Sequence, residues 1–247
     1  GPNSWPHRKD SICAFIHRVD PDIIDMQEVL HHQLEVLKTG LPEYTVVGVG
    51  REDGKTAGEY APIFFKQAKY TLLDQNTFWL CEKPDSVGMV GWDAALTRIA
   101  TWVKLQDKKT GQILMVVNTH FDHIGTEARR NSALLIIEKI KEIVGTSPAI
   151  LTGDFNVSED WDAYKTITNN EFILKDAHKV AGKRTGVDFT YHNFGKIPAE
   201  KCEKIDFIFV TPQIRVISSY IPFSQLNDTL FLSDHNPEIV ELEIEKS

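Results

Sequence analysis

The segment Ala149-Ile150-Leu151-Thr152-Gly153-Asp154-Phe155-Asn156 is a short apolar run that passes directly into polar residues. We interpret residues 149–151 as a strand and the polar residues as the start of a loop. An Asp in this position is most often a turn residue or a helix cap, and both roles stay open for Asp154. Strand ends are also rigid places from which side chains converge, so this segment is a candidate edge of a site.

The same arrangement recurs along the chain, with polar residues beside predicted strands. Glu28 follows residues 22–27, and Asn118-Thr119-His120 ends the strand that begins near Gln112. Ser233-Asp234-His235-Asn236-Pro237 comes just before the last predicted strand. Each residue alone is weak evidence, but together they indicate that one end of the fold is polar.

The pattern between these segments predicts one domain over residues 1–247, because no repeat, low-complexity tract or linker is present. Many strands with few helices between them favour stacked sheets flanked by helices, in the α+β class. Residues 98–105 and 112–118 predict a hairpin around Lys109-Thr110-Gly111. Helices are predicted over residues 8–19, 31–38 and 127–144, and further strands over residues 22–26, 44–49, 61–65, 70–80, 204–210, 214–221 and 238–244.

The composition excludes several classes of protein. The chain has 247 residues, of which 42% are apolar and 25% charged, as in ordinary globular proteins. The net charge of −8 argues mildly against binding generic duplex DNA, and it permits a small anionic substrate. The three cysteines are too few and too scattered for a disulfide framework or a cysteine-rich zinc site. No apolar run reaches membrane-spanning length and no signal peptide is visible, so the compartment, cytoplasmic or exported, stays undecided.

A role as turn residues does not explain Asp206 and His235 well. Asp206 lies within Lys204-Ile205-Asp206-Phe207-Ile208-Phe209-Val210, a predicted strand that should be largely buried. A buried carboxylate is costly unless it is paired or hydrogen-bonded, and the adjacent Asp234-His235 could meet it. An Asp that orients a His is a common way to build a general base near neutral pH. The alternative is a structural hydrogen bond without catalysis.

Five blocks in order resemble the endonuclease/exonuclease/phosphatase family, which includes DNase I, abasic-site endonucleases, neutral sphingomyelinases, inositol polyphosphate 5-phosphatases and poly(A) deadenylases. The resemblance covers nearly the whole chain and is nearest to bacterial members described only as hydrolases. It implies two stacked mixed β-sheets flanked by helices, a four-layer α/β/β/α sandwich. The blocks are residues 25–29, 118–123, 153–156, 204–209 and 233–237, of which Gly-Asp-Phe-Asn and Ser-Asp-His-x-Pro are the most specific.

The resemblance implies a metal-dependent phosphoesterase that uses Mg²⁺ or Mn²⁺. Glu28 matches the family's metal-binding Glu, and Asp234 matches a second acidic residue on the metal side. His235 matches the His that takes a proton from the attacking water, and Asp206 matches the Asp that orients it. A hard cation of this kind needs only one or two carboxylates, because it keeps several waters.

Four further positions match residues that handle the nucleophile and the phosphate. Asp154 matches the Asp that positions the nucleophile, and Asn156 matches a hydrogen-bond donor to the phosphate. His120 matches a residue that stabilises negative charge as the transition state forms. Arg98 opens a strand at which relatives often carry a phosphate-contacting Arg, so we assign it to substrate binding.

Several polar residues keep two interpretations. Glu59 either lines the site or is a solvated strand end, and Asp122 with His123 either holds the loop after His120 or forms a surface turn. His192 lies in a loop near a possible substrate position, although a lone loop His is more often incidental. His31-His32 is interpreted as surface, because adjacent helical residues point in different directions. Trp92 is a further possible substrate contact, on which we place no weight.

The chain departs from the family at its start. Family members open with a strand that ends in an Asn near the metal, and this chain shows no such strand before Asn3-Ser4-Trp5-Pro6. Asn3 is therefore not taken for that Asn. If the strand is absent, we expect weaker metal binding and reduced activity.

Three functional hypotheses remain beside the general phosphoesterase, which we expect to be a monomer without membrane insertion. The substrate, nucleic acid, nucleotide or lipid head group, is undecided. A sphingomyelinase-like phospholipid phosphodiesterase would favour an exposed apolar loop, for which residues 221–232 are a candidate. A non-catalytic binding module is disfavoured by the complete residue set. A zinc hydrolase is a poor fit because no tight zinc spacing is present.

Overall fold

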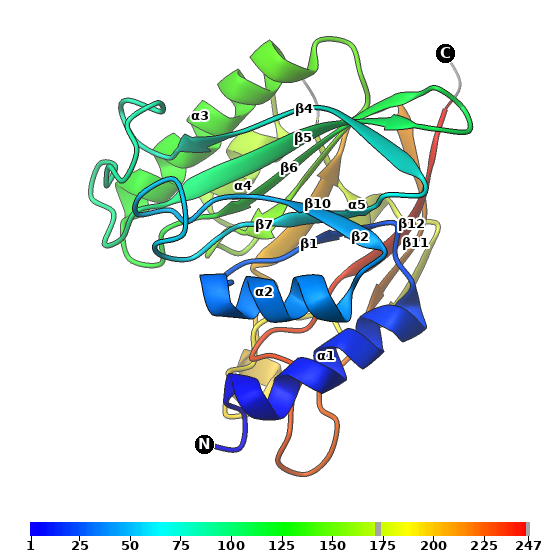
Figure 1. The fold of residues 1–247 in the computed structure, drawn as a ribbon. Helices are drawn as coiled ribbons and strands as arrows, with labels where there is room; N and C mark the ends of the chain where they lie inside the picture. Colours follow the sequence, from blue (N-terminus) through cyan, green and yellow to red (C-terminus); the bar gives the residue numbers. More distant parts are fainter. Residues whose placement is uncertain (171–173, 246–247) are drawn as a thin grey trace.

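A six-stranded sheet forms the centre of the protein in a computed structural model that describes residues 1–170 and 174–245 (Figure 1). All neighbouring strands are antiparallel except the third and fourth, which are parallel. In spatial order the strands are β4 (Tyr70–Trp79), β5 (Ile99–Asp107), β6 (Ile113–His120), β7 (Ala149–Asp154), β10 (Asp206–Val210) and β8 (Lys175–Asp176).

Two three-stranded sheets pack on the same face of this central sheet. In spatial order they are β1 (Ile23–Asp25), β3 (Ile63–Lys66) and β2 (Tyr44–Val47), and β12 (Ile239–Ile244), β11 (Ile214–Ile221) and β9 (Lys183–Gly186). Phe65 of β3 and Val216 of β11 belong to one apolar cluster with Val103 and Val116 of the central sheet. The two small sheets therefore act as a single second layer.

Helices cover the two outer surfaces of this stack (Figure 1). On the central sheet, α3 (Thr126–Val144) and α4 (Asp162–Thr168) pack through Ile136 and Ile167. On the small sheet of β1–β3, α1 (Trp5–Val19) and α2 (His31–Gly40) pack around Phe64. The short α5 (Ala177–Val180) and a 3₁₀ turn at Ala199–Lys201 lie in the connections. The predicted four-layer α/β/β/α arrangement is confirmed.

Successive side chains along a strand point to opposite faces of the sheet, and this explains why so many strands are continuous apolar runs in the sequence. In β6, Met115 and Val117 face the α3 side, whereas Leu114 and Val116 face the second sheet layer. Because both faces are covered, successive residues alternate between two apolar surroundings and not between core and water. This burial holds the strand ends rigidly in place.

Most predicted elements are present, with shifted boundaries. The hairpin is confirmed as β5 and β6, and its turn is closed by the Gly111 amide, which donates to the Asp107 carbonyl at 2.8 Å. Helix α1 begins at Trp5, three residues before the predicted start, because Pro6 is tolerated in a first turn where its missing N–H is not needed. Elements α4, α5, β8 and β9 were missed, since such short segments carry no clear periodic signal.

The start of the chain lies against a distant loop. The Asn3 Oδ1 atom accepts a hydrogen bond from the Phe231 amide at 2.8 Å, which agrees with excluding Asn3 from the metal site. The first element of the described chain is α1. The expected effect of an absent first strand on metal binding stays a prediction. Within the described residues, no helix combines the length and apolar character needed to cross a membrane.

Candidate active site

Strand register brings three predicted site residues into one row. His120 is the last residue of β6 and lies opposite Asp154, the last residue of the parallel strand β7. Asp154 in turn lies opposite Asp206, the first residue of the antiparallel strand β10. The three side chains therefore converge at one edge of the central sheet, although 86 positions separate the first from the last.

His235 reaches this row from the loop before β12. Its Nδ1 atom lies 2.7 Å from Asp206 Oδ2, and its Nε2 atom lies 3.8 Å from Asp154 Oδ2. A carboxylate only accepts hydrogen bonds, so Nδ1 carries the donated proton and Nε2 is directed toward Asp154. The predicted contact between Asp206 and His235 is present in the structure.

The loop that carries His235 is tied to the segment around Thr190. The Asn236 amide donates to the Thr190 carbonyl at 2.6 Å, and the Asn236 side chain donates to the Phe189 carbonyl at 3.1 Å. The Thr190 hydroxyl oxygen accepts from the Asp206 amide at 3.1 Å. Thr190 thus connects both members of the Asp–His pair. It was missed because a lone Thr in a loop has no distinctive sequence signal.

Glu28 completes the row from the loop after β1. Ligand atoms of Glu28, His120 and Asp154 all lie within 4.8 Å of one another, and so do those of Asp154, Asp206 and His235. Glu28 has a φ of 62°, a strained left-handed conformation for a side chain of this size. Asp234 belongs to neither group, although its carboxylate influences both Glu28 and His235 electrostatically.

The site concentrates negative charge. Burial, followed by the Asp206 carboxylate, raises the pKa of Asp154 well above its ordinary value. Glu28 faces solvent on one side, yet partial desolvation and the nearby Asp234 carboxylate raise its pKa as well. Burial disfavours the charged imidazole of His235, but Asp206 outweighs this and raises the pKa of His235 to about 10. This part of the molecule therefore has an excess of acidic groups.

These side chains fit a hard divalent cation. Glu28 and Asp154 offer carboxylate oxygens, and His120 offers an imidazole nitrogen within the same 4.8 Å group. Burial lowers the pKa of His120 well below its ordinary value, which keeps this imidazole neutral, as a metal ligand must be. A cation at this place would also reduce the repulsion between carboxylates whose pKa values are raised.

A polar network beneath Glu28 ties the two sheet layers together. The Thr152 hydroxyl donates to Asp25 Oδ2 at 2.5 Å, and the Gln27 side chain donates to Asn118 Oδ1 at 2.7 Å. Asn118 donates in turn to the Met26 carbonyl at 2.7 Å. The segment before Glu28 is thereby held against β6 and β7. Burial raises the pKa of Asp25 to about 7, with the Thr152 hydrogen bond opposing.

Arg98 and Asp122 form the side of the site beyond His120. Asp122 is 1% exposed and accepts hydrogen bonds from four backbone amides, those of Ala95, Leu96, Ile124 and Gly125. Although burial opposes it, this set of donors lowers the pKa of Asp122 to about 2. Asp122 therefore holds the loop after His120, and the alternative of a surface turn is wrong.

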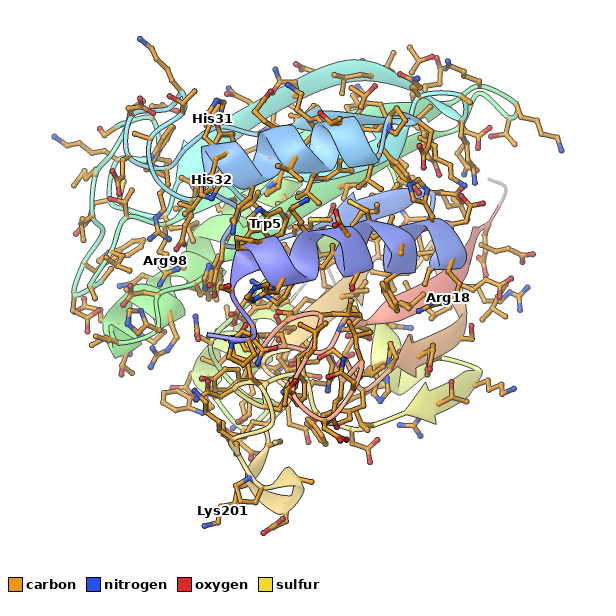
Figure 2. All side chains as sticks on the ribbon, turned by 60° about the horizontal axis from the view of Figure 1, so that its bottom comes forward. Trp5, Arg18, His31, His32, Arg98 and Lys201 are labelled. Atoms are coloured by element: carbon orange, nitrogen blue, oxygen red, sulfur yellow. The ribbon has the colours of Figure 1, made fainter. Side chains whose placement is uncertain are left out.

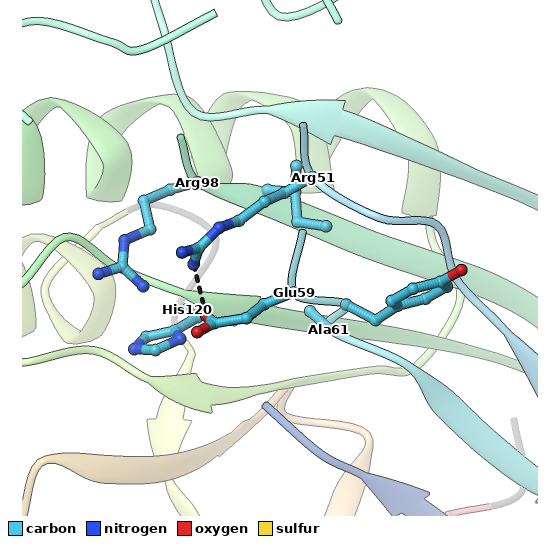
Figure 3. A pocket seen from close by; sticks show the side chains of 7 residues that line it. Arg51, Glu59, Ala61, Arg98 and His120 are labelled. Carbon is cyan, nitrogen blue, oxygen red and sulfur yellow. Dashed lines mark hydrogen bonds and ion pairs between the residues drawn. The ribbon is translucent and has the colours of Figure 1, made fainter. Parts of the chain in front are cut away.

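The two-fold interpretation of Glu59 is also decided by the structure. Its carboxylate accepts from Arg51 Nη1 at 2.6 Å, and both residues line a hollow together with Arg98 and His120 (Figure 3). Glu59 thus lines the site and is not a solvated strand end. Arg51 was missed, because a lone Arg in a loop has no distinctive sequence signal.

The other candidate residues lie outside this row. His192 is 1% exposed and hydrogen-bonds to the Ser224 hydroxyl at 3.0 Å, so it holds its loop together. His31 and His32 are exposed at the start of α2, as expected (Figure 2). Asn156 donates to the Phe121 carbonyl at 2.8 Å and adopts a φ of 49°. Its role toward a phosphate stays a prediction.

Comparisons with known proteins agree on one family. The model of the endonuclease/exonuclease/phosphatase family matches residues 1–235. The chain is similar to the solved endonuclease/exonuclease/phosphatase of Bacteroides vulgatus, with 62% identity, a TM-score of 0.96, and coverage of 99% of this chain and 93% of that one. It is also similar to a solved mannosyl-6-phosphatase of Bacteroides thetaiotaomicron, with 36% identity, a TM-score of 0.91, and coverage of 98% and 92%. Nocturnin of Drosophila melanogaster is 22% identical over 89% of this chain, which spans 38% of nocturnin.

Proposed function

Because this chain belongs to the endonuclease/exonuclease/phosphatase family, we propose that it hydrolyses phosphate esters with a divalent cation, Mg²⁺ or Mn²⁺, and an Asp206–His235 pair that activates water. Relatives that are phosphatases and relatives that are nucleases both support a phosphoesterase. The observation that carries the proposal is the 2.7 Å contact between His235 and Asp206 beside the acidic row.

The geometry supports a separate task for each side chain. Asp206 fixes the orientation and tautomer of His235, so that Nε2 is the atom that takes the proton from water. Asp154, 3.8 Å from that atom, is placed to hold the same water. A cation bound by Glu28 and Asp154 would neutralise these carboxylates, release the His235 proton and polarise the phosphoryl oxygen. In this proposal the neutral His120 donates a hydrogen bond to the phosphate oxygens, and the cation is held by the carboxylates.

The test is a substrate screen with Mg²⁺ or Mn²⁺ against p-nitrophenyl phosphate, bis-p-nitrophenyl phosphate, oligonucleotides and sphingomyelin. We expect His235→Ala to lower kcat at least about a hundredfold, the usual size of general-base effects. His32→Ala is the matched control, because His32 is exposed on α2. Chelation with EDTA should abolish turnover. Unchanged activity in His235→Ala would remove this residue from the mechanism, and no metal-dependent turnover on any substrate would favour a non-catalytic binding module.

A phospholipid phosphodiesterase is the second candidate function. The loop over residues 221–232 exposes Phe223 and Leu226, 43% and 41% respectively, as an apolar contact with lipid would require. Phe231 and Leu232 of the same loop are buried. Sphingomyelin turnover that falls in a Phe223→Ser, Leu226→Ser variant, with p-nitrophenyl phosphate turnover unchanged, would support this function.

A further inference from the structure

A second pocket lies on the side of the molecule where α3 and α4 cover the outer surface of the central sheet (Figure 1). We call it the helix pocket, and its aromatic and charged walls include Glu127, Arg129, Arg130, Trp161 and Asp162. Its volume is about 520 Å³, within the range of roughly 300–1,000 Å³ that small-molecule sites occupy. None of the residues in the proposed mechanism lines it, so the helix pocket is separate from the acidic row.

Trp161 is the aromatic wall of the helix pocket. It directly precedes α4 and is 43% exposed. The Arg129 guanidinium lies over its ring, with 5.0 Å between the guanidinium carbon and the ring centroid, and Arg129 itself is only 5% exposed. Because this cation–π contact covers the ring from a buried residue, it holds the exposed part of the indole at the pocket. Such a surface packs well against a flat apolar group.

Arg129 and Asp93 also line the helix pocket, but their charges are balanced within the protein. Arg129 Nη1 donates to the Asp122 carbonyl at 3.0 Å, and burial lowers the pKa of Arg129 while the Asp122 and Asp93 carboxylates oppose this shift. The Asp93 carboxylate accepts from the Ala128 and Glu127 amides at 2.7 and 3.2 Å, which fixes the first turn of α3. Arg129 Nε is nevertheless buried without an acceptor in the described part of the chain, so stability alone does not explain this arrangement.

Three charged side chains in the walls of the pocket have no partner in the protein. Glu127, Arg130 and Asp162 are exposed, and none of them forms an ion pair or a side-chain hydrogen bond within residues 1–170 and 174–245. An anionic ligand would be repelled by the two carboxylates, and a cationic ligand by Arg130 together with Arg129. A neutral molecule with hydroxyl groups meets neither penalty, because hydroxyls donate to carboxylates and accept from guanidinium groups.

A pyranose ring combines the two properties that these walls select. Its C–H groups form an apolar face that packs on an indole, and its edge carries hydroxyl groups. A nucleobase also stacks on tryptophan, but a nucleic-acid strand would bring further phosphates close to Glu127 and Asp162. The charge pattern of the helix pocket therefore favours a sugar over a nucleic-acid strand.

The helix pocket and the acidic row share two segments of chain. Val157 lines the pocket and comes three residues after Asp154, a separation of at most about 11 Å along the chain. The Phe121 amide donates to the Asp154 carbonyl at 2.8 Å, and the next residue, Asp122, accepts from Arg129 of the pocket wall. A phosphorylated mono- or oligosaccharide is long enough to span a separation of this size.

We propose that the helix pocket binds the carbohydrate part of a phosphorylated sugar whose phosphate ester lies at the acidic row. This inference rests on the proposed function, which assigns the ester to that row. Trp161 packs against the apolar face of the sugar ring. Glu127 and Asp162 accept hydrogen bonds from its hydroxyl groups, and Arg130 donates to them. These four residues determine specificity and take no part in the chemical step.

The kinetic test compares Trp161→Ala with the wild type and with Tyr220→Ala, a matched control because Tyr220 is 44% exposed on β11. The substrates are the 6-phosphates of glucose, mannose and galactose, and glycerol 3-phosphate, which has no ring. In Trp161→Ala, KM for the preferred hexose phosphate should rise about tenfold, as expected for one lost aromatic contact, with kcat and the constants for glycerol 3-phosphate unchanged within about twofold. An equal rise for both kinds of ester, or a wild-type preference for glycerol 3-phosphate, would overturn the proposal.

A binding measurement without phosphate separates this proposal from the hydrolase function. Saturation-transfer NMR with the methyl glycosides of glucose, mannose and galactose should detect binding of at least one of them to the wild type and to Tyr220→Ala, and none to Trp161→Ala. If no ester is hydrolysed, the hydrolase function fails, and this measurement still decides whether the pocket binds sugar.

Three results of the NMR measurement would refute the sugar site. They are the absence of signal from every glycoside in the wild type, an undiminished signal in a Trp161→Ala variant whose fold is verified by circular dichroism, and stronger binding of adenosine than of the glycosides. If Trp161→Ala does not fold, Arg130→Gln, which changes an exposed side chain, must weaken the glycoside signal.

Discussion

Two clusters of charged side chains lie next to each other at strand β10, and they differ in how their charges are balanced. In the acidic cluster, ligand atoms of Glu28, His120 and Asp154 lie within 4.8 Å of one another, and so do those of Asp154, Asp206 and His235, so three carboxylates and two imidazoles share one place. In the paired cluster, Lys204 Nζ lies 2.8 Å from Glu238 Oε2, and the Ser219 hydroxyl donates to Glu238 Oε1 at 3.2 Å. The paired cluster satisfies its charges internally and serves the fold. The acidic cluster leaves charge uncompensated, and this excess of charge supports the proposed cation site.

Lys204 connects the two clusters. Its Nζ atom donates to the Asp206 carbonyl at 2.7 Å as well as to Glu238, which is three residues after His235. The strand that carries Asp206 and the loop that carries His235 are thereby joined by one side chain. A structural ion pair thus helps to position Asp206 and His235, the pair that we propose to be catalytic.

The variant with the largest expected effect on the acidic cluster is Asp154→Asn. We expect activity to fall on the order of 10²- to 10³-fold, because the carboxylate that we propose to hold the nucleophile loses its charge. The free energy of unfolding in EDTA should rise by about 1 kcal/mol, since one of two facing carboxylates is removed. Urea unfolding and p-nitrophenyl phosphate turnover measure the two effects. A loss of both activity and stability would show that the acidic cluster serves the fold.

The paired cluster should respond in the opposite direction. Lys204→Met leaves Glu238 buried without its cation, and we expect the free energy of unfolding to fall by about 3 kcal/mol. Adding Glu238→Gln to the same variant should restore more than half of this loss. Urea unfolding measures both, with Lys139→Met, in an exposed pair, as control. If the double variant recovers none of the lost free energy of unfolding, the description of Lys204 and Glu238 as a structural ion pair is contradicted.

Asp25 extends the comparison to pH. Its pKa is raised to about 7 from 3.8, so between these values the folded state keeps a proton that the unfolded state releases. Stability should therefore fall as the pH rises through this window. Asp25→Asn should weaken the dependence, which the raised pKa values of Asp154 and Glu28 also produce, and exceed the wild type at pH 8 by about 1–2 kcal/mol. Thermal unfolding in EDTA from pH 4 to 8 tests this, and parallel pH curves would refute it.

The smallest effect is expected at the surface. Arg215 and Glu243 form an ion pair whose side chains are 58% and 61% exposed. Arg215→Gln should change the free energy of unfolding by no more than about 0.5 kcal/mol, because exposed pairs are screened by water and salt. A larger change in the free energy of unfolding, measured with urea, would mean that burial does not decide how much an ion pair contributes to stability.

The apolar pattern determined the main strands, the long helix α3 and the α+β class, because periodic burial leaves a direct trace in the sequence. The four-layer arrangement followed from the family resemblance. The pairing of Asp206 with His235 was also predictable, since a charged residue in an apolar strand needs a partner. Very short elements such as β8 and α5 were not predictable.

The tertiary structure alone decided which polar residues share a place. Arg51, Thr190 and the network of Asp25 with Thr152 come from distant segments, and nothing local distinguishes them from ordinary loop or strand residues. Strand register placed His120, Asp154 and Asp206 in one row, and burial turned Asp122 from a possible surface turn into the anchor of a loop. The sequence indicates which residues are buried. The hydrogen-bond or ion-pair partner of a buried polar residue is decided by contacts between distant segments of the fold.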